Sequence, residues 1–218
     1  KFDDCQALVK KAFADSDLEY LNLSSANSID IGRLLPQTVY YFWAYTQLSK
    51  QNGNDPIIFS VPSGNFGDMM GGMLAMKMGL PVEKFVIATN ENDEVPKFLA
   101  TGEYHKIEPS RNCLSNAMNV GHPSNLARLV ALYGGVMDEK GNISKMPDMN
   151  GLNKDIFSIS ITDDDTRHTI QKAYKKYKLI NKVHKITNYD KKTIKKILKR
   201  NNIKINIDLA KQLKKDSV

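Results

Sequence analysis

The sequence has few cysteines, few histidines and no long apolar run, and each shortage excludes a class of protein. Its 218 residues contain two cysteines, Cys5 and Cys113, too few for a disulfide scaffold and typical of a reducing compartment. The four histidines lack the spacing of zinc ligands. No stretch approaches the roughly 20 apolar residues that a membrane helix needs, and residues 1–20 show no signal-peptide core. We therefore expect no metal, no membrane partner and a cytoplasmic location.

The positive charge of the chain is concentrated at one end. The net charge is +7, whereas residues 181–218 alone hold twelve Lys or Arg against three Asp, so the remainder is slightly acidic. In residues 191–200 the basic side chains alternate with isoleucine and leucine, which predicts an amphipathic helix with a solvated basic face. A basic tail can bind nucleic acid, but this one has a single aromatic, Tyr189, and no DNA- or RNA-binding motif. We expect a main domain over residues 1–180, a basic helical segment over 181–218, and no nucleic-acid partner.

The most informative stretch of the sequence is residues 57–78. Residues 57–61 are mostly apolar and rich in β-branched side chains, as in a buried strand, and residues 69–78 have no proline and many helix formers. Between them, Gly64 and Gly67 permit backbone conformations closed to other residues, so that successive amides can bind one anion at the helix N-terminus. A tight strand-to-helix connection without any ligand explains the same glycines, because the loop matches neither the dinucleotide-binding fingerprint nor the nucleotide-binding P-loop.

A second strand is predicted over residues 84–89, and with the first strand and its helix it makes a βαβ unit. Such a unit favours an α/β fold with an open, mainly parallel sheet and helices on both faces. Residues 90–93 follow this strand, where open parallel sheets bind ligands, although they can equally cap a helix over 94–100. A third strand is predicted over 156–161, and the acidic residues 162–166 after it are typical of a helix start.

Residues 37–48 are dense in aromatic side chains and predict a helix. We interpret it as a core helix packed beneath the sheet, with tyrosine hydroxyls at its edge. A stacking surface for nucleic-acid bases is the less favoured alternative.

Hydroxyl and amide side chains crowd the segment before that helix. Asn27, Ser28 and Asp30 can each cap a helix or brace a turn. A binding role is the alternative, with Arg33 suited to a phosphate because its guanidinium fork matches phosphate oxygens. We favour the binding role for Asn27, Ser28 and Arg33.

The loop and its surroundings resemble the threonine synthase family. The resemblance is carried by VPSGNFGD at residues 61–68, GLPV at 79–82 and ATNENDEVP at 88–96. It implies the fold type II of pyridoxal 5′-phosphate (PLP) enzymes, shared with the tryptophan synthase β subunit, and PLP as the cofactor. It also implies which main-chain amides hold the cofactor phosphate, namely those of Ser63, Gly64, Asn65, Phe66 and Gly67.

The same resemblance extends to other segments. SANSID at residues 25–30 resembles the family's substrate-binding SANSIN segment, which supports the role given to Asn27, Ser28 and Arg33, although Asp30 stands where asparagine is usual. Residues 114–119 resemble a segment that the family brings toward its active site. Thr187 falls where the family has a threonine facing the pyridine nitrogen, but the residues after it keep little of the pattern.

The implied reaction is the lyase conversion of O-phospho-L-homoserine and water to L-threonine and phosphate, in amino-acid biosynthesis. The family's Schiff-base lysine lies in a Phe-Lys-Asp motif upstream of a stretch that matches residues 2–6. No such tripeptide occurs in these 218 residues. We therefore name no catalytic residue and expect the fold to be incomplete without upstream residues. A catalytically inactive relative that binds PLP or a phosphorylated metabolite is the alternative, and a monomer or homodimer is expected.

Overall fold

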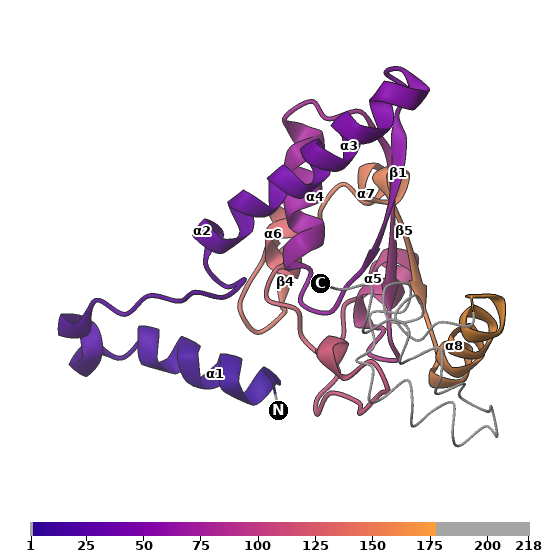
Figure 1. The fold of residues 1–218 in the computed structure, drawn as a ribbon. Coiled ribbons are helices and arrows are strands. Elements are labelled where there is room, and N and C mark those ends of the chain that lie inside the picture. The colour runs from indigo at the N-terminus through magenta and orange to yellow at the C-terminus, as the bar shows by residue number, and fades with distance from the viewer. Residues whose placement is uncertain (1, 178–218) are drawn as a thin grey trace, which may run out of the picture. The chain divides into compact units, whose positions relative to one another are not determined.

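A parallel sheet organises the part of the chain that the computed structural model describes, residues 2–177. Its strands are β1 (Ile57–Pro62), β2 (Val82–Thr89) and β5 (Ile156–Ser160), in the order β1-β2-β5 and all parallel. Figure 1 shows them running side by side. Because each strand is reached by a connection that contains a helix, the α/β class with a parallel sheet that the sequence predicts is confirmed.

The other elements of the described residues are mostly helices. They are α1 (Phe2–Phe13), the 3₁₀ helix η1 (Ser16–Leu21), α2 (Ile31–Leu34), the 3₁₀ helix η2 (Leu35–Gln37), α3 (Thr38–Asn52), α4 (Gly67–Lys77), α5 (Glu94–Thr101), the 3₁₀ helix η3 (Asn116–Met118), α6 (Leu126–Leu132), the strands β3 (Val136–Met137) and β4 (Ile143–Lys145), α7 (Met149–Asp155) and α8 (Asp163–Tyr177). Strands β3 and β4 pair antiparallel in a sheet of their own. No helix of residues 2–177 has the length and apolar character needed to cross a membrane.

Helix α4 approaches both α3 and the sheet closely because residue 72 is glycine. A Cβ atom at Gly72 would lie 2.6 Å from Cε1 of Tyr41 on α3 and 2.7 Å from Cε1 of Phe85 on β2. Tyr41 meets Phe59 of β1 edge to face, with 4.8 Å between ring centroids, and Phe59 stacks on Phe85 at 5.9 Å. These three rings join the two helices to two strands, which fixes the start of α4 relative to the end of β1.

The expected core role of the aromatic helix is right for only one of its faces. Tyr41 is buried, whereas Tyr40 is 64% exposed and Trp43 is 67% exposed. Positions 40 and 43 are three residues apart and therefore share a helix face, which Val39 extends. The count of aromatic residues alone does not say which face they occupy, and this is why the prediction was wrong for Tyr40 and Trp43.

Helix α8 belongs to a second compact unit, which begins at residue 161. Its start is a capping box in which Thr162 Oγ1 accepts a hydrogen bond from the amide of Asp165 at 3.1 Å. In return, Asp165 Oδ2 accepts from the amide of Thr162 at 3.3 Å. Thr162 and Asp165 therefore cap this helix, which confirms the helix start that the sequence predicts over residues 162–166. The predicted basic segment over residues 181–218 lies outside the described residues.

We predict that Gly72→Ala destabilises the protein. Alanine gains up to about 1 kcal/mol of helix propensity, but overpacking against rings that hold one another costs about 1–3 kcal/mol. The midpoint of urea unfolding should therefore fall. Gln47→Ala, on the exposed side of α3, is the control and should leave the midpoint unchanged. An unchanged or higher midpoint for Gly72→Ala would show that the rings yield to the added methyl group.

Candidate functional site

The loop over residues 63–66 joins β1 to α4 at the carboxyl end of the parallel sheet. Open parallel sheets bind their ligands at this end. Phe66 is the residue before the helix, and its backbone is left-handed at φ 61° and ψ 16°. The sequence predicts special backbone angles for Gly64 and Gly67, and this is wrong, because neither has a positive φ.

The two loop glycines are required for space instead. A Cβ atom at Gly64 would lie 3.0 Å from the Cα of Met118, and one at Gly67 would lie 2.8 Å from the Cβ of Ser28. Both contacts reach segments far away in the sequence. Because glycine has no Cβ atom, the loop can lie close to residues 28 and 118. Any other residue at position 64 or 67 would push the loop away from them.

The main-chain amides of the loop have unequal roles. The amide of Ser63 donates to the carbonyl oxygen of Ala88 at 2.8 Å and so continues the pairing of β1 with β2. The amides of Gly64, Asn65, Phe66 and Gly67 donate to no acceptor within residues 2–177. Four successive amides at the N-terminus of an eleven-residue helix carry the partial positive charge that attracts a phosphate. The predicted set of five amides is thus reduced to four, because Ser63 uses its amide in the sheet.

The side chain of Asn65 is committed to other parts of the protein. Its Nδ2 donates to Ser28 Oγ at 2.6 Å and lies 2.9 Å from Ser124 Oγ, while its Oδ1 accepts from the Ser124 amide at 2.8 Å. Its carbonyl oxygen accepts from Nδ2 of Asn125 at 2.9 Å. Only the main-chain amide of Asn65 is left to contact an anion.

The predicted substrate residues are divided by the structure. Ser28 lies against the loop through Asn65 and Gly67. Asn27 braces a turn, because its Oδ1 accepts from the amide of Ile29 at 2.8 Å. Arg33 is exposed on α2, and no ion pair or hydrogen bond joins it to the loop within residues 2–177. Of the three, only Ser28 is placed by these contacts against the loop of residues 63–67.

Arg128 on α6 is a residue of this site that the sequence did not identify. Its Nη1 donates to the carbonyl oxygen of Ser28 at 3.0 Å and to Oδ1 of Asn125 at 2.6 Å, and its Nη2 donates to the carbonyl oxygen of Ile29. Asn125 is fully buried and caps α6 by position without a side-chain capping bond. In the sequence, Asn125 indicates no more than a helix start, and nothing indicates that Arg128 reaches a segment 100 residues away.

The asparagines after β2 bind another loop. Asn90 Nδ2 donates to Asn119 Oδ1 at 2.8 Å, and Asn92 Oδ1 accepts from the amide of Arg111 at 2.7 Å. The N-cap residue of α5, Asp93, makes no side-chain capping bond. Asn90 and Asn92 are buried and hold residues 111–119 in place, so capping of α5 is not their role, while ligand binding at residues 90–93 stays a prediction.

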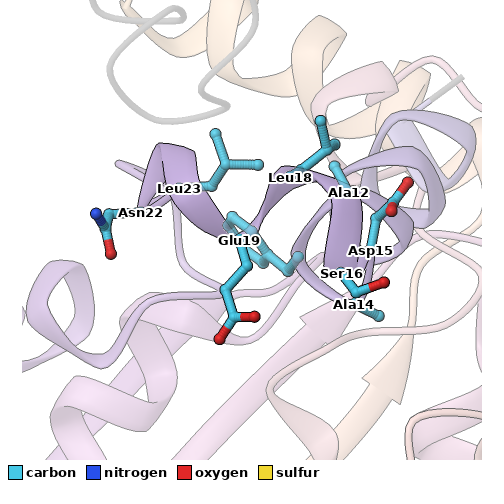
Figure 2. Close-up of a pocket in the computed structure, with 9 residues that line it drawn as sticks. Ala12, Ala14, Asp15, Ser16, Leu18, Glu19, Asn22 and Leu23 are labelled. Carbon is cyan, nitrogen blue, oxygen red and sulfur yellow. The ribbon is translucent and has the colours of Figure 1, made fainter.

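Two further predictions and one hollow concern other parts of the chain. Thr187 lies outside the described residues. Within residues 2–177, no group of three His, Cys, Asp or Glu side chains is placed to hold a metal ion. The hollow of about 440 Å³ in Figure 2 lies at the end of α1, and its lining includes the carboxylates of Asp15 and Glu19. Two carboxylates repel a phosphate, so this hollow does not extend the candidate anion site.

Glu94, at the start of α5, is a buried acid with a displaced pKa. The residue is 2% exposed. Burial raises the pKa of its carboxyl to about 7, with smaller upward contributions from Asp93 and Asp3 and a downward one from Arg111. Its Oε2 accepts no hydrogen bond within residues 2–177. The carboxyl therefore keeps its proton to a higher pH in the folded protein than in the unfolded chain.

The comparison with known sequences finds one family repeatedly, although no family model matches the chain. A threonine synthase of Serratia marcescens is 51% identical over 133 residues, which are 61% of this chain and 30% of that protein. A threonine synthase of Haemophilus influenzae is 42% identical over 174 residues, which are 79% of this chain and 38% of that protein. The chain thus spans 30–40% of the length of the curated relatives it matches.

Solved structures of the same family share the fold. The crystal structure of threonine synthase from Escherichia coli superposes with a TM-score of 0.66 at 35% identity, covering 94% of this chain and 42% of that one. PLP-bound threonine synthase from Brucella melitensis gives a TM-score of 0.67 at 31% identity, covering 88% of this chain and 45% of that one. The parallel sheet and its helices therefore fit the fold type II of PLP enzymes.

We predict that the raised pKa of Glu94 makes the protein less stable as the pH rises from about 4.5 to 7, and that no further loss from this group follows above that range. A pKa raised by about 2.5 corresponds to roughly 3 kcal/mol of lost unfolding free energy. Glu94→Gln cannot ionise, so its unfolding free energy should fall less than that of the wild type between pH 5 and pH 8. Urea unfolding at both pH values measures the difference, with Glu83→Gln on the exposed side of β2 as the control. Parallel losses in the wild type and Glu94→Gln would contradict the displaced pKa.

Proposed function

We propose that this chain, which is related to the threonine synthases in sequence and in fold, forms the part of a PLP-dependent threonine synthase that binds the cofactor phosphate. The observation that carries the proposal is the set of four amides of residues 64–67 at the start of α4, which have no acceptor within residues 2–177. When bound, PLP supplies an electron sink for chemistry at the carbon atoms of an amino-acid substrate.

The loop fits the phosphate group of PLP by its chemistry and its space. Main-chain amides at a helix N-terminus stabilise a dianion without a basic side chain. Gly64 and Gly67 have no Cβ atom, and this lets the loop lie close to residues 118 and 28 respectively. The hydrogen bonds of Asn65 to Ser28 and Ser124 hold the loop against two other segments of the chain. The residues of this chain therefore bind and orient the phosphate end of the cofactor.

The substrate of the proposed enzyme is O-phospho-L-homoserine, which reacts with water to give L-threonine and phosphate. Ser28 lies beside the cofactor loop, so the segment of residues 27–30 is the proposed place for the substrate. Arg33 on the following helix is the proposed partner for its phosphate, since it is exposed and cationic. We further propose a cytoplasmic enzyme that acts as a monomer or homodimer.

A second candidate is a binding protein without turnover. It is favoured by the same four amides, because main-chain donors at a helix N-terminus would hold a phosphorylated ligand whether or not a reaction follows. Such a protein would bind PLP or a phosphorylated metabolite at the same four amides. Release of inorganic phosphate from O-phospho-L-homoserine by the whole polypeptide distinguishes the enzyme from the binding protein.

We predict that the chain binds pyridoxamine 5′-phosphate and does not bind pyridoxamine, because the four amides contact the phosphate. The amine form of the vitamin is chosen because it has no aldehyde to react with the many surface lysines. Gly64→Ala and Gly67→Ala should each weaken binding by about tenfold or more, since each new methyl group forces the loop away from its neighbours. Equilibrium dialysis measures the affinities.

Gly134→Asn is the matched control. Gly134 lies in open space with φ 77°, a conformation that asparagine tolerates. This variant should bind as the wild type does. Equal binding of pyridoxamine 5′-phosphate and pyridoxamine would contradict the proposed phosphate-binding role of residues 64–67. So would undiminished affinity in both Gly64→Ala and Gly67→Ala.

A further inference from the structure

We propose that Arg128 is a positioning residue that holds the substrate segment, residues 27–30, against the cofactor loop, residues 63–67. This inference rests on the proposed function. It concerns how a ligand bound at the cofactor loop affects the substrate segment. The side chain that couples the two, Arg128, lies on neither of them.

The contacts of Arg128 close a ring that links three separate parts of the chain. Its guanidinium donates to the carbonyl oxygens of Ser28 and Ile29, and to Oδ1 of Asn125 at 2.6 Å. Asn125 in turn donates to the carbonyl oxygen of Asn65, and the side chain of Asn65 donates to Ser28 Oγ. Each member is therefore fixed by two others, and Arg128 supplies three of the hydrogen bonds.

The chemistry of the guanidinium suits a positioning role. Its fork of fixed donors reaches two successive carbonyl oxygens and an amide oxygen at once, which the single ammonium of lysine cannot reproduce. Within residues 2–177, no carboxylate forms an ion pair with Arg128. Its hydrogen bonds to neutral oxygens thus fix the position of the 27–30 segment. They do not neutralise the guanidinium, so its positive charge remains near the proposed phosphate sites.

The route from the loop to the segment is short. A Cβ atom at Gly67 would lie 2.8 Å from the Cβ of Ser28 and 3.6 Å from Nδ2 of Asn125. A phosphate held by the amides of residues 64–67 would stabilise the loop against local opening. Because Ser28 contacts Asn65 and Gly67, and Arg128 holds Ser28 from the other side, opening of the segment is suppressed together with opening of the loop.

Hydrogen exchange measured by mass spectrometry on the whole chain, with and without pyridoxamine 5′-phosphate, tests this role. In the wild type, we expect the ligand to slow exchange in the peptide that covers residues 24–34. In Arg128→Met, exchange in that peptide should be faster by about tenfold without ligand, and the ligand should slow it by a smaller factor than in the wild type, because only the contacts of Ser28 with Asn65 and Gly67 then join the segment to the loop. Each variant is measured at a concentration of pyridoxamine 5′-phosphate that saturates it, as established by equilibrium dialysis.

Two further variants make the result specific. Arg128→Lys should behave like Arg128→Met, because one ammonium cannot hold both carbonyl oxygens. Arg167→Met is the matched control, since the ion pairs of Arg167 are with Asp163 and Asp164 on its own helix. It should leave the exchange of residues 24–34 and its response to ligand unchanged.

The outcomes separate this inference from the proposed function. If the wild type binds no pyridoxamine 5′-phosphate, the proposed function fails and this inference fails with it. If the wild type binds and the ligand slows exchange of residues 24–34 in Arg128→Met by the same factor as in the wild type, the positioning role alone is wrong. Faster exchange throughout the molecule in Arg128→Met, including strands β1 and β2, would overturn it as well, because Arg128 would then support the fold as a whole.

Discussion

The hydrogen bonds of the Asn65 side chain are the interaction on which the candidate site depends. They hold the loop to Ser28 on one side and Ser124 on the other, so that three segments meet at one point. An asparagine amide is suited to this task because it donates and accepts at the same time. With the side chain occupied in this way, the main-chain amides of residues 64–67 remain for an anion.

The sheet determines where that meeting point lies. The amide of Ser63 pairs with Ala88, so the ladder between β1 and β2 runs one residue past the strand and ends where the loop begins. Gly72 then allows α4 to lie close to Tyr41 and Phe85, which sets the direction in which its N-terminus points. The position of the candidate anion site is therefore a consequence of strand pairing and helix packing.

Much of this arrangement can be predicted from sequence, because it depends on local patterns. The strand at residues 57–61, the following helix and the second strand have periodicity and composition that fix their type. Contacts between residues far apart in the sequence cannot be predicted in this way. Examples are the close approach of Gly67 to Ser28 and the hydrogen bonds of Arg128 to the carbonyl oxygens of residues 28 and 29. The exposure of Trp43 and Tyr40 has the same cause, since the face that a helix buries depends on the neighbours it meets.

The left-handed backbone of Phe66 has a consequence for how a ligand arrives. This conformation costs roughly 1 kcal/mol for a residue that is not glycine, while complete burial of the phenyl ring contributes about 2–3 kcal/mol, and Phe66 is 2% exposed. The buried ring thus stabilises the turn in the conformation that leaves the amides of residues 64–67 available to an anion. A phosphate that bound to these amides, as proposed, would therefore consume little of its binding energy in ordering the polypeptide.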